Sequence, residues 1–199
     1  MAITSGVEQP GRRARLSRLL TLAKPGSVVV QLRDRELSAA ARLALARELR
    51  AETASAGQRL VINDRLDLAL LVGADGLHLP EAGLPIEAVR ERCPTLWLSA
   101  ARHSLSPLGD SPASGALPDA WVLSPIVSPR KGRPALGLTA LAAAREELQA
   151  PVYALGGVTA ASAAACLAHG ACGVAVMGAV MDPGEDLPAL LAALSILTA

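Results

Sequence analysis

The chain has 199 residues, of which 51% are apolar and 19% charged, and its formal net charge at pH 7 is +1. This balance excludes a broad electrostatic field for nucleic acid or an acidic membrane, and the aromatic residues are too few for a base-stacking surface. No apolar run reaches the ~18 residues that span a bilayer, and three cysteines fit no disulfide set. We therefore expect one compact cytoplasmic domain over residues 1–199, with neither nucleic acid nor membrane as a partner.

Short apolar strands alternate with helical segments along the whole chain. The expected strands are Ala2–Thr4, Val28–Leu32, Leu60–Ile62, Gly76–Leu79, Leu96–Leu98, Trp121–Leu123, Val152–Leu155 and Gly173–Met177. The expected helices are Arg13–Leu22, Ser38–Thr53, Leu66–Val72, Pro85–Arg92, Thr139–Leu148, Ala160–His169 and Asp186–Leu197. A helix in the fifth crossover, Ser104–Pro118, is expected to be short or absent because prolines and glycines interrupt it. Eight strands alternating with helices predict an α/β fold, a single-domain (β/α)₈ TIM barrel.

Polar residues that follow the strands are the first candidates for a site, because a barrel of this kind binds its ligands at the carboxyl ends of its strands. After the second strand, Gln31, Arg33 and Arg35 share one face, and two guanidiniums there suit a phosphate or carboxylate. A rim of salt bridges with Asp34 and Glu36 accounts for the same pattern equally well.

After the third strand, Asn63 and Asp64 are either a pair of ligands or the cap of the next helix, and capping is the better-supported reading. Histidine occurs at three positions. His169 is explained by its place at a helix end, and His78 by a place in the barrel wall. His103 follows the fifth strand, and because histidine transfers protons near neutral pH it is the candidate catalytic residue.

The long loop after the sixth strand contains the basic pair Arg130 and Lys131, which can close over an anion, although an exposed solvated loop is the alternative. Glycines at the ends of the last two strands let backbone N–H groups approach an anion, and the following helix N-terminus adds a favourable dipole. A TIM barrel usually holds a phosphate at this place. The expected phosphate-binding residues are Gly156, Gly157, Met177 and Gly178.

Seven segments, in order along the chain, resemble a known superfamily: 30–35, 62–69, 73–79, 124–126, 137–138, 154–158 and 173–177. It is the superfamily of thiamine phosphate synthase and thiazole tautomerase, both (β/α)₈ enzymes of thiamine biosynthesis. The similarity covers nearly the whole chain. It implies a phosphorylated thiazole as the small-molecule ligand, and it leaves the oligomeric state open, with a homodimer as one expectation because such barrels often pair through exposed helices.

Resemblance to the synthase implies the coupling of a pyrimidine diphosphate to a thiazole phosphate, with Mg²⁺ neutralising the pyrophosphate that leaves. Gln31 and Arg33 match its anion-binding positions, whereas Arg35 stands where the synthase has lysine. Asp64 matches one of its metal-binding aspartates. Gly83 stands where the second would be, and a single carboxylate makes a poor Mg²⁺ site.

Resemblance to the tautomerase rests on Arg33-x-Arg35, on His78-Leu79-Pro80 and on His103-Ser104-Leu105. The tautomerase converts a non-aromatic thiazole carboxylate phosphate into its aromatic tautomer, its histidine shuttles the proton, and it uses no metal. Asp64 departs from that branch, which tends to lack an aspartate there.

We expect an isomerase of the tautomerase kind, without a cofactor and with His103 as general acid and base. The expected substrate-binding residues are Gln31, Arg33, Arg35, Asn63 and Lys131. The first alternative is a thiamine phosphate synthase with Mg²⁺ at Asp64. The second is a regulatory barrel without catalysis that keeps only its phosphate site.

Overall fold

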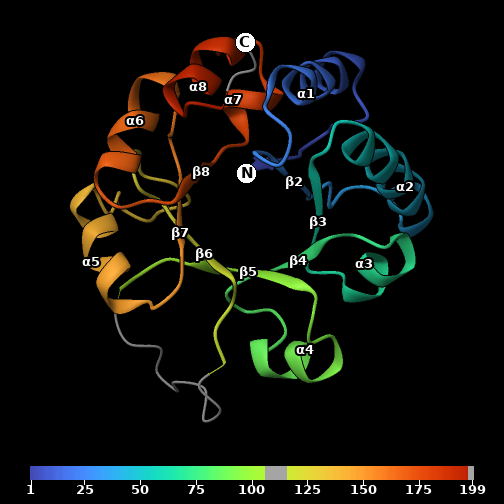
Figure 1. The fold of residues 1–199 in the computed structure, drawn as a ribbon, viewed down its shortest axis with the longest axis horizontal. Helices are drawn as coiled ribbons and strands as arrows, with labels where there is room; N and C mark the ends of the chain where they lie inside the picture. The colour runs from blue at the N-terminus through green and yellow to red at the C-terminus, as the bar shows by residue number, and fades with distance from the viewer. Residues whose placement is uncertain (106–115, 197–199) are drawn as a thin grey trace.

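The computed structural model describes residues 1–105 and 116–196, and it confirms the predicted barrel. Eight parallel strands pair in sequence order within one sheet (Figure 1). They are β1 (Ala2–Ile3), β2 (Val29–Leu32), β3 (Arg59–Asn63), β4 (Gly76–Leu79), β5 (Trp97–Arg102), β6 (Ala120–Leu123), β7 (Val152–Leu155) and β8 (Gly173–Ala175). Most of the fifth crossover, residues 106–115, lies outside the described part, so the expectation of a poor helix there is untested.

The sheet closes on itself where its last strand meets its first. Ala2 and Val176 form a parallel bridge just beyond the end of β8. The Ile3 N–H donates to the Val176 carbonyl at 2.8 Å, and the Val176 N–H donates to the Met1 carbonyl at 2.9 Å. Closure of this kind leaves no unpaired strand edge for another chain to join.

Helices in the described part form a ring around the strands (Figure 1). They are α1 (Pro10–Leu22), α2 (Ala39–Ser55), α3 (Leu66–Val72), α4 (Ile86–Arg92), α5 (Thr139–Glu147), α6 (Ala160–Ala168), α7 (Gly178–Met181) and α8 (Leu187–Ala193). The Ser38 side chain accepts a hydrogen bond from the Ala41 N–H at 3.2 Å and so caps the start of α2. None of the described helices is both long and apolar enough to cross a membrane.

Several elements begin or end at other residues than predicted, and one element was not predicted. Strand β5 continues to Arg102 because Ser99 and Arg102 pair with neighbouring strands, although their side chains break the apolar run. Helix α7 was not expected, because four residues are too few to show a helical period.

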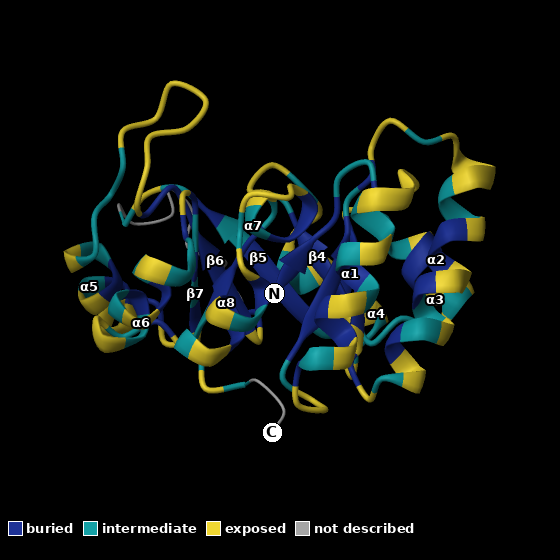
Figure 2. Ribbon diagram, turned by 90° about the horizontal axis from the view of Figure 1, so that it is seen from above, coloured by how far each residue is buried: buried dark blue, intermediate teal, exposed yellow. Residues whose placement is uncertain are grey.

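Apolar side chains form two clusters, one between the strands and the helices and a smaller one inside the barrel. The inner cluster contains Ile3, Val61 and Val122, so the barrel is a filled core below its upper rim. In Figure 2 the strands are buried and the outer helix faces are exposed. Loops at the carboxyl ends of the strands rise above this core, and they carry the candidate site.

Candidate active site

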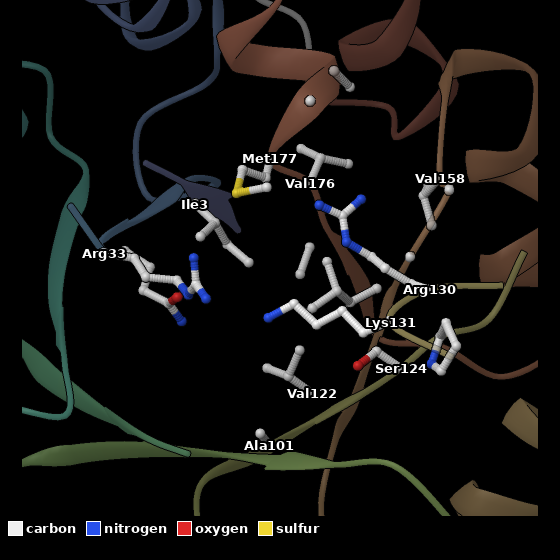
Figure 3. Close-up of a pocket in the computed structure, with 18 of the residues that line it drawn as sticks. Ile3, Arg33, Ala101, Val122, Ser124, Arg130, Lys131, Val158, Val176 and Met177 are labelled. Carbon is white, nitrogen blue, oxygen red and sulfur yellow. The ribbon is translucent and has the colours of Figure 1, made fainter. Parts of the chain in front are cut away.

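A cavity of about 580 Å³ opens at the carboxyl ends of the strands (Figure 3). The structure brings every residue predicted for catalysis, substrate binding or phosphate binding to its lining, although the roles of these residues stay predictions. They are Gln31, Arg33, Arg35, Asn63, His103, Lys131, Gly156, Gly157, Met177 and Gly178. Asp64, the metal ligand expected for a synthase, is not among the lining residues.

The end of β2 supplies Gln31, which is buried, and the two arginines that follow it. The interpretation as a rim of salt bridges is wrong for Asp34, which accepts hydrogen bonds from the Thr4 hydroxyl and from the Val7 N–H. Burial, with Arg35 and Arg130 nearby, lowers the pKa of Arg33. The guanidinium of Arg33 therefore faces the cavity among like charges.

The capping interpretation of Asn63 and Asp64 is also wrong. Helix α3 starts after Arg65, and no side chain caps it. Asn63 is buried at the end of β3 and turns toward the cavity, whereas Asp64 has a φ of 66° and donates its N–H to the His78 carbonyl at 2.9 Å. This left-handed residue moves the Asp64 side chain out of the cavity lining.

His78 both belongs to the wall, as expected, and lines the cavity. Its Nδ1 lies 2.9 Å from the Ser99 hydroxyl oxygen, so β5 holds the ring in place. Burial, with Arg33 and Arg35 nearby, lowers the pKa of His78 from 6.5 to about 4. The imidazole is consequently neutral near pH 7 and adds no charge to the site.

His103 follows β5 directly, and its ring is held by the end of β6. Its Nδ1 lies 2.8 Å from the Ser124 carbonyl oxygen and 3.0 Å from the Ser124 hydroxyl oxygen. A carbonyl only accepts, so Nδ1 carries the proton and Nε2 keeps a lone pair. The His103 N–H also donates to Glu81 Oε1 at 3.1 Å. His103 thus lies in the cavity lining with Nδ1 turned to Ser124, and its catalytic role stays a prediction.

The basic loop after β6 folds back as a short hairpin, in which Arg130 and Arg133 exchange two backbone hydrogen bonds of 3.0 Å. In Figure 2 an exposed loop rises beside α5 above the barrel. Figure 3 shows Lys131 extending into the pocket from the side opposite Arg33. Arg130, Lys131 and Arg133 all contribute to the lining, while the loop from residue 127 to 134 is exposed, as the alternative of a solvated loop expects.

Gly156 and Gly157, which follow β7, pack closely against the loop after β6. A Cβ on Gly156 would lie 2.8 Å from Pro125 Cα, and one on Gly157 would lie 2.3 Å from Ser128 Oγ. Both glycines have positive φ, and no described residue accepts a hydrogen bond from the Gly157 or Val158 N–H groups. These two N–H groups are therefore available to an anion, as the strand-end prediction requires.

At the N-terminus of the helix after β7, one of the N–H groups expected to face an anion already has a hydrogen-bond partner. Glu185 Oε1 accepts a hydrogen bond of 2.6 Å from the Ala160 N–H in the first turn of α6. Helix α6 itself begins with a capping box between Thr159 and Ser162. A phosphate here would depend on loop N–H groups and on basic side chains more than on the end of α6.

The carboxylates of the described residues do not form a three-ligand site for Mg²⁺. The described part of the chain contains no group of three or more His, Cys, Asp or Glu side chains placed to hold a metal ion. Glu81 lies 3.7 Å from Arg133, and a Cβ on Gly83 would lie 2.9 Å from Pro80 Cδ and 3.0 Å from the Pro80 carbonyl oxygen. The cavity lining therefore lacks the two aspartates that the resemblance assigns to Mg²⁺ in the synthase.

Ser124 and Arg133 were not predicted as site residues. Ser124 ends an apolar strand, and one hydroxyl gives no signal that it will hold a histidine 21 positions earlier. Arg133 could have been predicted from the sequence, because it extends the basic pair Arg130 and Lys131 in the same loop.

Fold and cavity together define a TIM-barrel protein that presents basic side chains and free N–H groups at the carboxyl ends of its strands. Residues 1–180 match the model of the TMP-TENI family, described as thiamine monophosphate synthase. The chain belongs to this family, and hence to a family of thiamine-biosynthesis enzymes.

Similar proteins carry names from the same pathway. A putative thiamine-phosphate synthase of Geobacter sulfurreducens is 41% identical over 173 residues, which are 83% of this chain and 80% of that protein. A thiamine-phosphate synthase of Methanoculleus marisnigri is 40% identical over 167 residues, or 82% and 78%. The solved thiamine phosphate pyrophosphorylase of Pyrococcus furiosus superposes with a TM-score of 0.82 at 26% identity, covering 98% of this chain and 94% of that one.

Proposed function

We propose that the chain catalyses the synthase reaction, in which a pyrimidine diphosphate is coupled to a thiazole phosphate. The observation that carries this proposal is one cavity lined by two sets of groups that suit anions. Arg33 and Arg35 after β2 form one set, and the N–H groups of Gly157 and Val158 after β7 form the other. The names of the relatives support the same reaction over the isomerisation expected from the sequence.

Cavity size agrees with a small-molecule substrate. A volume of about 580 Å³ lies within the range of pockets that hold drug-sized ligands, which run from about 300 to 1,000 Å³. In the reaction the C–O bond to the diphosphate breaks and its electron pair leaves with the oxygen. The thiazole nitrogen lone pair forms the new C–N bond, so no proton has to move in this step. Holding both substrates in line is then the main task of the site.

A second candidate function is the tautomerase reaction, and the orientation of His103 favours it. Ser124 fixes the proton on Nδ1, which leaves Nε2 as a base beside the cavity. A 1,3-proton shift needs such a base, whereas the transfer step does not. In the described part of the chain, no three His, Cys, Asp or Glu side chains come together to hold a metal ion.

One pair of assays separates the two reactions. Purified protein is given a pyrimidine diphosphate and a thiazole phosphate, and formation of thiamine phosphate supports the synthase. The same protein is given the non-aromatic thiazole carboxylate phosphate, and aromatisation without thiamine phosphate formation would contradict the synthase in favour of the isomerase. In that case His103→Gln should lower kcat by about 10²-fold or more, while His169→Gln, at the exposed end of α6, should leave it unchanged.

A further inference from the structure

The cavity holds more positive charge than its own carboxylates neutralise. Its lining contains five basic side chains, namely Arg33, Arg35, Arg130, Lys131 and Arg133. It contains three acidic ones, Glu81, Asp182 and Glu185. Within the described residues, only one of these basic side chains forms an ion pair, which is Arg133 with Glu81.

The other two lining carboxylates are engaged elsewhere. Asp182 pairs with Arg12 at 3.0 Å, and Glu185 accepts its hydrogen bond from Ala160. Asp34, next in sequence to Arg33, is bonded to Thr4 and Val7. Four basic side chains are therefore left for a ligand, and we call them the cation cluster: Arg33, Arg35, Arg130 and Lys131.

These four charges come from two separate loops that face one another across the cavity. Arg33 and Arg35 follow β2, while Arg130 and Lys131 lie on the hairpin after β6. Figure 3 shows Arg33 and Lys131 on opposite sides of the pocket. Guanidiniums brought together in this way repel one another, and a bound anion with several negative charges removes that repulsion.

Turn geometry at the end of β4 works against a metal ion at the same place. The Gly83 N–H donates to the Pro80 carbonyl at 2.8 Å, and this tight turn leaves no space for a Cβ on Gly83. Asp64, on the neighbouring strand end, does not reach the cavity lining. Neither of the two positions that match the synthase's metal-binding aspartates therefore brings a carboxylate into the cavity lining, while the cations remain.

We propose that the cation cluster binds a diphosphate group directly and takes the place of a divalent metal ion. This inference rests on the proposed synthase reaction for the source of the diphosphate. When the C–O bond of the pyrimidine diphosphate breaks, the negative charge on the leaving oxygen is stabilised by guanidinium and ammonium groups. The electron pair, the new C–N bond and the net charge balance without a metal or a proton donor.

The direct test is isothermal titration calorimetry of the full chain with inorganic pyrophosphate, once in EDTA and once with excess Mg²⁺. We expect binding in EDTA and equal or weaker binding with Mg²⁺, because the ion competes with the cluster for the anion. Arg35→Gln should weaken binding about tenfold or more, and Lys131→Gln should do the same. Arg47→Gln, on an exposed stretch of α2, should bind as the unmodified protein does.

Binding that requires Mg²⁺, or binding unchanged in both cluster variants, would overturn the inference. A parallel assay for thiamine phosphate keeps it separate from the proposed function. Product formed in EDTA supports both. Product formed only with Mg²⁺ overturns the metal-free cluster and leaves the synthase. Pyrophosphate bound in EDTA without any product overturns the synthase and leaves the cluster.

Discussion

At the scale of single residues, the surroundings of each side chain in this site decide its charge and its orientation. His78 and His103 both line the cavity, yet His78 is buried against Ser99 and His103 is held by Ser124 at the rim. Burial favours the neutral imidazole of His78. The same residue type thus supplies a neutral wall at one strand end and a candidate base at the next.

The lowered pKa of His78 makes stability depend on pH. The folded protein binds the His78 proton with a pKa of about 4, whereas the unfolded chain binds it near 6.5. The unfolded state therefore takes up more protons between these values, and stability present above pH 6.5 is lost as pH falls toward 4. The loss from this residue is at most about 3 kcal/mol.

Urea unfolding at pH 7 and at pH 4.5 measures this effect. His78→Gln should show a smaller drop in the free energy of unfolding between the two pH values than the unmodified protein. His169→Gln is the matched control, because His169 is exposed and bonds only to the Ala165 carbonyl of its own helix. Equal drops in all three proteins would show that His78 is not the group that titrates.

At the scale of elements, the loop after β6 and the glycines after β7 form one unit. Val127 donates its N–H to the Gly156 carbonyl at 2.8 Å, and Ser128 does so at 3.3 Å. The loop can sit this close only because neither glycine has a side chain. The glycine pair, which is the predicted phosphate site, and the basic hairpin are thus positioned by the same contact.

Gly157→Ala should break this contact. The added Cβ would meet Ser128 Oγ at 2.3 Å, at a φ of +75°. We expect a loss of about 1–3 kcal/mol in the free energy of unfolding, together with weaker phosphate binding. Gly26→Ala is the control, since Gly26 has a φ of +77° and no atom within 4 Å of an added Cβ. If both variants lose the same stability, backbone strain alone explains the result.

Periodicity and apolar runs predict the elements well and predict side-chain directions less well. All the expected strands and helices are present in the described residues, because eight short runs separated by helical segments leave few other folds. Helix α7 was missed because one turn has no period. Asp64 was judged by its position after a strand, but its positive φ turns it away from the cavity, and no local pattern reveals a backbone angle.

At the scale of the whole molecule, the net charge is nearly zero, but positive charge is concentrated at one cavity. The net charge is +1, yet five basic side chains line one cavity at one end of the barrel. The field that a diphosphate meets therefore comes from the rim and weakens over about 10 Å at ~0.1 M salt.

Substrate binding should consequently weaken as salt is added. Raising NaCl from low to high ionic strength is expected to raise KM for the diphosphate substrate by on the order of tenfold. Arg33→Gln should flatten this dependence, whereas Arg47→Gln should keep it. Steady-state kinetics at a series of NaCl concentrations, with kcat followed separately, gives the comparison. A salt dependence that is the same in all three proteins would contradict a local field.

The turn from Pro80 to Gly83 restricts any change of the site back toward metal binding. A Cβ added by Gly83→Asp would lie 2.9 Å from Pro80 Cδ and 3.0 Å from the Pro80 carbonyl oxygen. Replacing Pro80 would remove only the first of these contacts, because the carbonyl oxygen belongs to the backbone. An aspartate at this position therefore requires the turn itself to move, and the cations opposite would still repel the incoming ion. The backbone of one short turn thus limits the chemistry that this barrel can acquire.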